Sequence, residues 1–382
     1  MWSRVPESVK TLLWPLLLAT FFAAVYTVRV QREMVDFDVY RRAAERAVNG
    51  ENLYRPDDGH YQFKYLPAFA IAMRPIAAVQ APIAKAGWYA LSCALLIMLL
   101  RWSVRALPER NRGERVLLWL TALVVAKFFA RELLLGQTNV VLAALLIGAL
   151  LAALVDAYRT AGALVGLGVF VKVYALILIP WLMLAGGVPA LATAALVIGL
   201  GLIAPAVVYG WQGNMEQVAG WWRTVTDTTT LPNLLNAENV SAMSAWTKWT
   251  GEGPHVTWLA LATVLGAVAL AAFVVSRRRD VTEPLYLEFG LLMLLVPVIS
   301  PQGWDYLLLI ATPAMVCLID RWSLVTRPWR IATAIGIVLV SFTMYDLIGR
   351  AAYRALMSAG VLTIGTLTLA VCLANLRMKK LA

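Results

Sequence analysis

The sequence predicts an all-α, polytopic membrane protein. Hydrophobic residues make up 61% of its 382 residues, the mean hydropathy is +0.72, and only 14% of the residues are charged. Ordinary soluble domains carry roughly 25% charged residues, and a membrane-spanning helix needs about 20 consecutive apolar residues. Many such runs occur along the chain, so we expect a single integral membrane domain over residues 1–382.

The net charge of +11 does not indicate a nucleic-acid partner, because most of the basic residues lie in short segments between apolar runs. Such basic segments are typical of cytoplasmic loops. Cys93, Cys317 and Cys372 lie inside apolar runs, so no disulfide framework is expected. Residues 1–10 lead into an apolar run without a small-residue cleavage site, so we expect an uncleaved first helix.

The first span is expected at residues 11–28, with a cytoplasmic start because Arg4 and Lys10 precede it. The next apolar segment, residues 66–79, is short and is broken by Arg74 and Pro75, which favours an interfacial or re-entrant helix. Further spans are expected at residues 83–100, 116–135, 139–155, 188–208, 256–275, 285–299, 304–318, 331–345 and 358–374. The basic stretches 101–115, 277–279, 321–330 and 377–380 are then cytoplasmic, and the loops 29–82 and 211–255 are external.

One segment, residues 162–184, decides this topology. A single crossing there would place the loop 211–255 in the cytoplasm and would move every later basic loop outside. We therefore expect a hairpin of two short half-helices that turns near Lys172, since a lysine inside an apolar run is costly unless it reaches a polar cavity. This gives about twelve membrane segments with both termini inside.

The first external loop carries the clearest candidates for chemistry. Residues 39–48 have apolar side chains on one helical face and charged side chains on the other, which predicts an amphipathic helix that ends at Asn49-Gly50. Asp38 occupies the position where the N-cap of this helix is expected. Asp36 lies outside that helix and is our candidate general base. Asp36-Phe37-Asp38 is also a D-x-D pattern, which binds a metal in soluble sugar-nucleotide enzymes, but three residues are too few to indicate a metal site.

Other candidates lie between or within the spans. Gly136-Gln137-Thr138-Asn139 joins two spans on the outer side, either as a simple turn or as part of a site. Lys172 is a candidate phosphate ligand, with structural pairing as the alternative. Lys127, Arg131 and Glu132 lie in one span, and the last two are near enough to its outer end to snorkel to the surface.

Two further outer segments contain polar residues: 236–241, with Asn239 and Ser241, and 300–306, with Trp304 and Asp305. The second is either a Pro/Gly turn with an interfacial tryptophan or part of a site. His60 and His255 have no cysteine or glutamate at ligand spacing, so no zinc site is expected. The chain lacks the P-loop, G-x-G-x-x-G and G-x-S-x-G motifs.

Together these segments resemble a family-87 membrane glycosyltransferase of the GT-C class. The matching residues, in order along most of the chain, are Asp36, Val39, Tyr40, Gly50, Tyr54, Phe63, Tyr65, Pro67, Gly136, Gln137, Asn139, Lys172, Asn239, Ser241, Ser300, Pro301 and Trp304. The family usually has a second proline where this chain has Leu66. It often has histidines, candidates for contacting the carrier phosphate, where this chain has Tyr306 and Leu307.

The resemblance implies transfer of mannose, or sometimes another sugar, from a polyprenyl phosphate carrier to a lipid or glycan acceptor. The actinobacterial phosphatidylinositol-mannoside mannosyltransferases are members of this family. The implied location is the bacterial inner membrane, with the active site on the periplasmic side. No cofactor and no divalent metal are expected.

The family's external-loop aspartate corresponds to Asp36, which would act as the base of an inverting transfer. The expected phosphate and donor ligands are Lys172, Lys64, His60, Gln137 and Asn139. The expected sugar and acceptor contacts are Asp38, Tyr61, Tyr65, Asn239, Ser241, Trp304 and Asp305. The alternative is a transporter or flippase of lipid-linked sugars, with Lys172 at a broken helix as its substrate site; the long first loop argues against it.

Overall fold

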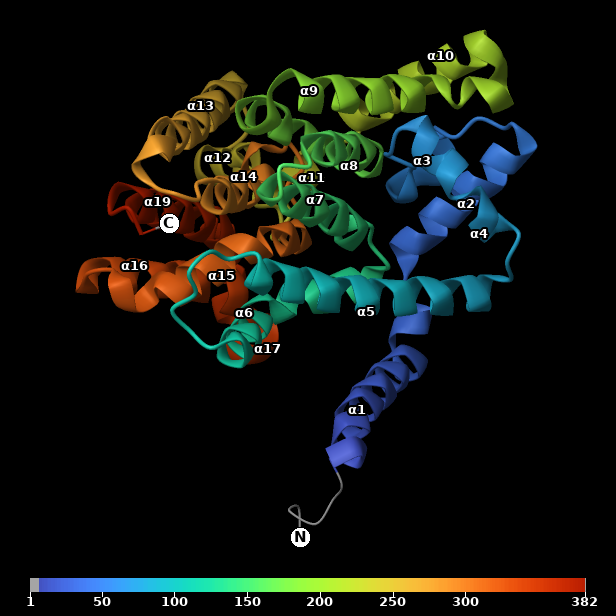
Figure 1. The fold of residues 1–382 in the computed structure, drawn as a ribbon. Coiled ribbons are helices and arrows are strands. Elements are labelled where there is room, and N and C mark those ends of the chain that lie inside the picture. Colours follow the sequence, from blue (N-terminus) through green and yellow to red (C-terminus); the bar gives the residue numbers. More distant parts are fainter. Residues whose placement is uncertain (1–6, 382) are drawn as a thin grey trace.

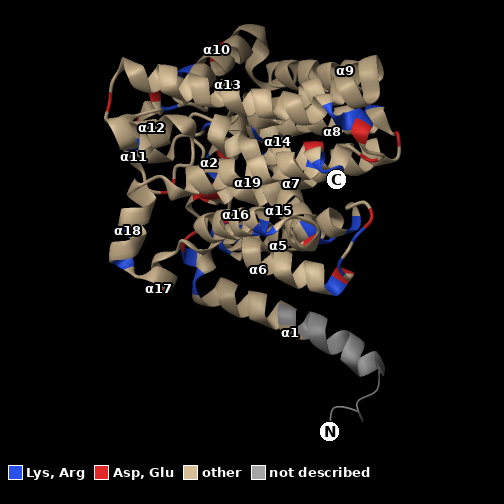
Figure 2. Cartoon of the chain, turned by 90° about the vertical axis from the view of Figure 1, so that its left-hand side faces the viewer, with Lys and Arg blue, Asp and Glu red and all other residues tan. Residues whose placement is uncertain are grey.

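The computed structural model describes residues 7–381, and the chain is helical without a β-strand over that range (Figure 1). Five helical stretches in this range are long and apolar enough to cross a membrane by length and composition, at residues 81–105, 173–203, 254–280, 305–324 and 361–378. Figure 2 shows that most of the helical surface carries neither acidic nor basic residues. The predicted class, a helical membrane protein, is confirmed, and the count of about twelve segments stays a prediction.

The longer helices follow the predicted apolar runs closely. The first half of the chain contains α1 Glu7–Val28, α2 Val35–Asn49, α3 Pro67–Ala72, α4 Arg74–Ala77, α5 Ala81–Arg105, α6 Glu114–Leu135, α7 Asn139–Leu154, α8 Tyr158–Val171 and α9 Ile179–Ile203. The second half contains α10 Ala206–Asp227, α11 Leu231–Leu235, α12 Ala242–Thr250, α13 Pro254–Ser276, α14 Leu285–Ile299, α15 Thr312–Asp320, α16 Arg327–Ile337, α17 Tyr345–Ile348, α18 Arg350–Ser358 and α19 Val361–Met378. Short 3₁₀ helices precede α9 and α15.

Helix α2 begins four residues earlier than the sequence predicts. Its N-cap residue is Met34, so Asp38 lies inside the helix and the N-cap prediction for Asp38 is wrong. The buried side chain of Phe37 explains the earlier start, because it lies three residues before the buried Tyr40 and extends the apolar face of the helix backwards by one turn. The predicted end is confirmed: Gly50 has φ +67° and its N–H bonds to the carbonyl oxygen of Arg46.

Residues 66–79 form only the two short helices α3 and α4, of six and four residues. Neither is long enough to cross a membrane. Helices α2, α3 and α4 lie together at one side of the helical body, on the right in Figure 1. Residues 66–79 therefore form no helix that crosses the membrane, as predicted, and the external position of this loop stays a prediction.

The chain reverses direction at Lys172, as predicted for the hairpin. Lys172 has an extended backbone (φ −153°, ψ 132°). Gly168, which precedes it, packs against Ala175, which follows it. The returning segment reaches the start of α8, where Gly186 packs against the ring of Tyr158. Residues 172–186 therefore run antiparallel to α8.

A second reversal follows at Gly187, whose φ of +62° and ψ of −153° interrupt helix α9. Beyond it the chain runs parallel to α8, because Gly162 contacts the backbone of Ala190 and Phe170 contacts Gly201. The continuous apolar stretch 173–203 thus consists of two antiparallel segments and is not one straight helix. Glycines on α8 allow this close approach, since a Cβ at Gly162 would lie 2.2 Å from the Ala190 carbonyl oxygen.

The basic segments predicted to be cytoplasmic pack against one another at one end of the helices. Arg278 donates to Glu288, and the fully buried Arg377 lies beside the same carboxylate, so the ends of α13, α14 and α19 meet. Arg321 donates to the carbonyl oxygens of Pro108 and Glu109, which adds the loop after α5. Segment 301–306, which lines the pocket described next, follows α14 and so lies at the opposite end of that helix.

Candidate active site

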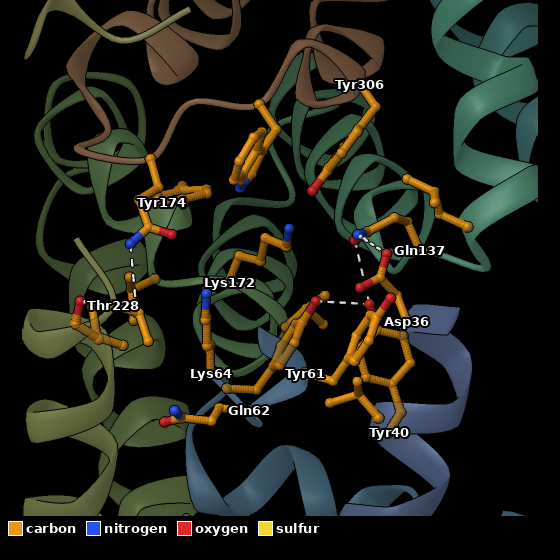
Figure 3. Close-up of a pocket in the computed structure, with 18 of the residues that line it drawn as sticks. Asp36, Tyr40, Tyr61, Gln62, Lys64, Gln137, Lys172, Tyr174, Thr228 and Tyr306 are labelled. Atoms are coloured by element: carbon orange, nitrogen blue, oxygen red, sulfur yellow. Dashed lines mark hydrogen bonds between the residues drawn. The ribbon is translucent and has the colours of Figure 1, made fainter. Parts of the chain in front are cut away.

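A cavity of about 450 Å³ lies where the two predicted external loops meet. The loops are joined by two hydrogen bonds: Leu53 N–H donates to Gln217 Oε1 at 3.0 Å, and Trp221 Nε1 donates to the Lys64 carbonyl oxygen at 3.2 Å. The break at Lys172, the turn between α6 and α7 and the segment 301–306 complete the wall. Chain segments far apart in sequence therefore contribute to a single pocket (Figure 3).

Asp36 reaches this pocket from the first turn of α2, so the expectation that it lies outside the helix is wrong. Its Oδ2 accepts a hydrogen bond of 2.7 Å from Gln137 Nε2, which comes from the turn between α6 and α7. Burial raises the pKa of the Asp36 carboxyl above its ordinary value, while the Lys172 charge and the Gln137 hydrogen bond act in the opposite direction. The carboxylate is therefore shielded from water yet held beside positive charge.

Lys172 and Lys64 line the same pocket as Asp36, and Figure 3 shows both of them to the left of Asp36. Neither ammonium group forms an ion pair or hydrogen bond with the part of the chain that the structure describes. Lys172 Nζ lies 5.8 Å from the ring centroid of Tyr65 and 6.0 Å from that of Tyr306. Burial lowers the pKa of Lys64, and the charge of Asp36 opposes this shift.

Aromatic side chains form much of the remaining wall. Tyr61, Tyr65 and Trp304 line the pocket, as does His60. Trp304 stacks on Tyr306 with ring centroids 6.5 Å apart and an angle of 15° between the planes. Such flat apolar faces with few charges suit a sugar ring or a lipid chain.

Comparison with known proteins assigns the chain to a family. The sequence model described as glycosyltransferase family 87 matches residues 63–301, which is more than half of the chain. The chain belongs to glycosyltransferase family 87. No curated protein and no solved structure matches it significantly. The matched range includes Lys64, Gln137 and Lys172, whereas Trp304 lies just after its end and Asp36 lies in the segment before its start.

Eight of the predicted site residues line the pocket of this family-87 glycosyltransferase: Asp36, His60, Tyr61, Lys64, Tyr65, Gln137, Lys172 and Trp304. Asn139 lies behind Gln137 and is fully buried. Asp38 points elsewhere, because its Oδ2 accepts a hydrogen bond of 2.8 Å from Lys85 on α5. Residues two apart on a helix do not face each other, so the two acids of the D-x-D pattern have different surroundings.

The remaining predicted residues hold the pocket wall together rather than line it. Asn239 pairs with Trp304 in an isolated antiparallel bridge, and Ser241 Oγ caps helix α12 by accepting from Ser244 N–H. Asp305 is fully buried and forms ion pairs with Lys127 at 3.1 Å and with Arg131 at 3.5 Å. Binding of a sugar by these side chains stays a prediction.

The structure adds charged residues that the sequence did not single out for the site. Arg131 and Glu238 line the pocket and form a bidentate ion pair with each other. The expectation that Glu132 snorkels to the surface is wrong, because its side chain is fully buried and accepts two hydrogen bonds. A carboxylate inside an apolar span was the available signal for Glu132; the pairing of Arg131 with Glu238 had none.

Proposed function

We propose that this glycosyltransferase transfers a sugar, most simply mannose, from a polyprenyl phosphate carrier to a lipid or glycan acceptor with inversion at the anomeric carbon. The reaction takes place at the periplasmic face of a bacterial inner membrane. The observation that carries this proposal is the pair of lysines, Lys172 and Lys64, that have no carboxylate ion-pair partner among the described residues and lie beside the half-buried Asp36. No metal or cofactor is part of it.

The two ammonium groups suit an anionic donor. Both lysines are half-buried, and a charge partly removed from water without a partner is unfavourable, so a ligand that supplies negative charge would explain their placement. A phosphate linked to the anomeric carbon of a sugar is such a ligand. As the carbon–oxygen bond to the phosphate breaks, the leaving phosphate gains a negative charge that Lys172 and Lys64 stabilise.

Asp36 provides the base that an inverting transfer needs. The acceptor hydroxyl oxygen forms the new bond to the anomeric carbon, its proton moves to the Asp36 carboxylate, and the bond electrons leave with the carrier phosphate. The burial of Asp36 raises its pKa, which makes it a better proton acceptor than an exposed aspartate. Tyr61, Tyr65 and Trp304 supply faces on which the sugar can stack.

The surroundings of the pocket fit a lipid-linked donor. Val169, Phe170 and Val171 line it next to Lys172, and they offer an apolar path from the phosphate position toward the lipid. A lipid carrier needs no nucleotide-binding fold, and the chain contains no glycine-rich nucleotide motif. We further propose about twelve membrane segments, which the two reversals at Lys172 and Gly187 support.

The test is sugar transfer by the purified protein in detergent. We expect radiolabelled mannose to move from synthetic polyprenyl phosphate mannose to an acceptor in a panel of lipids, and not from the nucleotide-linked sugar. Transfer from the nucleotide-linked sugar alone would contradict the proposed donor. Movement of the intact lipid-linked sugar across proteoliposomes, with no transfer, would favour the flippase alternative.

A further inference from the structure

Behind Asp36 lies a chain of buried polar groups that ends at a second carboxylate. Glu132 Oε2 accepts a hydrogen bond of 2.9 Å from Asn139 Nδ2, and the same nitrogen lies 3.5 Å from Gln137 Oε1. Gln137 Oε1 also accepts from the hydroxyl of Tyr40 at 3.3 Å. Gln137 Nε2 then donates to Asp36 Oδ2 at 2.7 Å.

The two carboxylates determine which way each amide in this chain points. Ionised carboxylates only accept hydrogen bonds, so Asn139 must present its nitrogen to Glu132. Asn139 Oδ1 has no hydrogen-bond partner among the described residues, yet turning the amide would set that oxygen against Glu132. With the nitrogen of Asn139 and the hydroxyl of Tyr40 both next to Gln137 Oε1, the Gln137 nitrogen must face Asp36.

We propose that Gln137 is a positioning residue for the base Asp36, and that Glu132, acting through Asn139, fixes the orientation of the Gln137 amide. This inference rests on the proposed role of Asp36. The Gln137 donor occupies Oδ2 and leaves Oδ1, which makes no hydrogen bond to the described residues, available for the acceptor hydroxyl. Gln137 and Asn139 thus serve the base instead of binding the donor.

Glu132 also has a structural role that any test must separate from this one. Its Oε1 accepts a hydrogen bond of 2.7 Å from Val140 N–H in the first turn of α7, so it stabilises the helix start. Loss of that bond would lower stability without any effect on Asp36. The decisive measurement is therefore the protonation of Asp36 itself, which a merely structural role does not change.

A carbodiimide that modifies protonated carboxyl groups reports this protonation without any substrate. Labelling of Asp36 is followed by mass spectrometry over a range of pH. The groups that act electrostatically on Asp36 are Lys172, His60, Lys64, Glu132, Tyr40, Tyr65 and Tyr306. The substitutions are therefore chosen to leave the charge of these groups unchanged wherever possible.

In Gln137→Met, the Asp36 carboxylate loses its hydrogen-bond donor, so the pH of half-labelling should rise by about one unit. Tyr40→Phe removes the hydroxyl that donates to Gln137 Oε1, so it should raise the pH of half-labelling by less than Gln137→Met does. The control is Gln212→Met, since Gln212 is exposed and bonds only to Glu216. If Gln137→Met titrates like this control, Gln137 does not position Asp36.

The contribution of Glu132 is isolated by a double-mutant cycle. Glu132→Gln is made in two backgrounds, one with the native Asn139 and one with Asn139→Leu. Loss of the Glu132 charge changes the electrostatic potential at Asp36 equally in both backgrounds. Any effect of Glu132 that is transmitted through the Asn139 amide is present only in the background that keeps Asn139. We therefore expect the shift in half-labelling pH to differ between the two backgrounds; equal shifts would reduce Glu132 to a helix cap.

Transfer kinetics then separate this inference from the proposed function. With the synthetic donor, Gln137→Met should lower kcat and move the acidic limb of the pH profile upward, with KM for the donor unchanged. A raised KM with an unmoved limb would make Gln137 a donor ligand and overturn the inference. If labelling behaves as expected but the wild-type protein transfers no sugar, the positioning stands and the proposed donor is wrong.

Discussion

The indole nitrogen of Trp221 donates a hydrogen bond of 3.2 Å to the backbone carbonyl oxygen of Lys64. These two residues belong to different predicted external loops, and the bond can form only if both loops are on the same side of the membrane. It also fixes the backbone at the position from which the Lys64 side chain enters the pocket. Topology and site are therefore tested together by the first experiment.

We predict that cysteines placed at Asn52 and Glu252, both exposed, react with a membrane-impermeant thiol reagent added from outside. A cysteine at the exposed Arg279 should react only after the membrane is permeabilised. The three native cysteines are buried and are first replaced. Labelling of just one of the two loop positions from outside would contradict the shared side and the hairpin at Lys172.

Lys172→Met should lower transfer by about 10²–10³-fold, because the leaving phosphate loses a preorganised positive charge. Lys172→Arg keeps the charge but not the shape of the ammonium group, so part of the activity should remain. Initial rates with the synthetic donor measure both. Lys379→Met, at an exposed position at the far end of α19, is the matched control. Full activity in Lys172→Met would assign the residue a structural role.

Asp36→Asn should lower transfer by about 10²–10⁴-fold while donor binding persists, because asparagine keeps the size of the side chain but accepts no proton. Asp38→Asn is the comparison: it loses the ion pair with Lys85, in which the Asp38 carboxylate is 44% exposed, and should have a small effect. The reverse order of severity would move the base to Asp38. If both variants are inactive and transfer by the unmodified protein depends on added divalent metal, the D-x-D pattern is a metal site and the general-base account fails.

The pH range in which the protein transfers sugar should be narrower than the range set by an exposed aspartate and an exposed lysine. Activity rises as Asp36 loses its proton, and because burial raises the pKa of Asp36, this acidic limb lies above that of an exposed aspartate. Activity falls when Lys64 loses its proton, and because burial lowers the pKa of Lys64, this limb lies below that of an exposed lysine. Lys64→Arg should move only the alkaline limb, toward higher pH. An unmoved alkaline limb would show that Lys64 does not set it and would assign it to Lys172.

Gly303→Ala should destabilise the pocket wall. A Cβ at this position would lie 1.8 Å from the Pro297 carbonyl oxygen, and the Gly303 carbonyl oxygen accepts a hydrogen bond of 2.6 Å from Val240 N–H. We expect a loss of about 1–3 kcal/mol in unfolding free energy, seen as a lower Tm in detergent. Gly199→Ala, where nothing lies within 4 Å of a new Cβ, should leave Tm unchanged or raise it slightly.

The sequence predicts the pocket residues that lie in turns between apolar runs. Once the spans are assigned, Gln137 and the first loop must meet at the same face, and a lysine inside an apolar segment marks the break at Lys172. Charge and hydropathy alone are therefore enough to predict that Asp36, Gln137 and Lys172 come together, and all three line the pocket.

The partners of individual polar groups could not be predicted in this way. From the sequence, Asp38 is expected to cap a helix, but its carboxylate forms an ion pair with Lys85. Asp305 is expected to contact the sugar, but its carboxylate forms ion pairs with Lys127 and Arg131. Each partner is distant in sequence, and apolar periodicity carries no information on which polar side chains face each other. The partners of Glu132 are only seven and eight residues away, at the start of the following helix, but the expectation for Glu132 is wrong because apolar periodicity does not show that its carboxylate turns toward them.

The unpaired lysines at the centre of the pocket also bear on the end of the reaction cycle. On the proposed chemistry the donor phosphate is a diester with one negative charge, and the released carrier phosphate is a monoester that can carry two. Lys172 and Lys64 therefore hold the spent carrier more tightly than the donor. Departure of the carrier, rather than bond formation, would then set the turnover rate, and added polyprenyl phosphate would inhibit by competing with the donor.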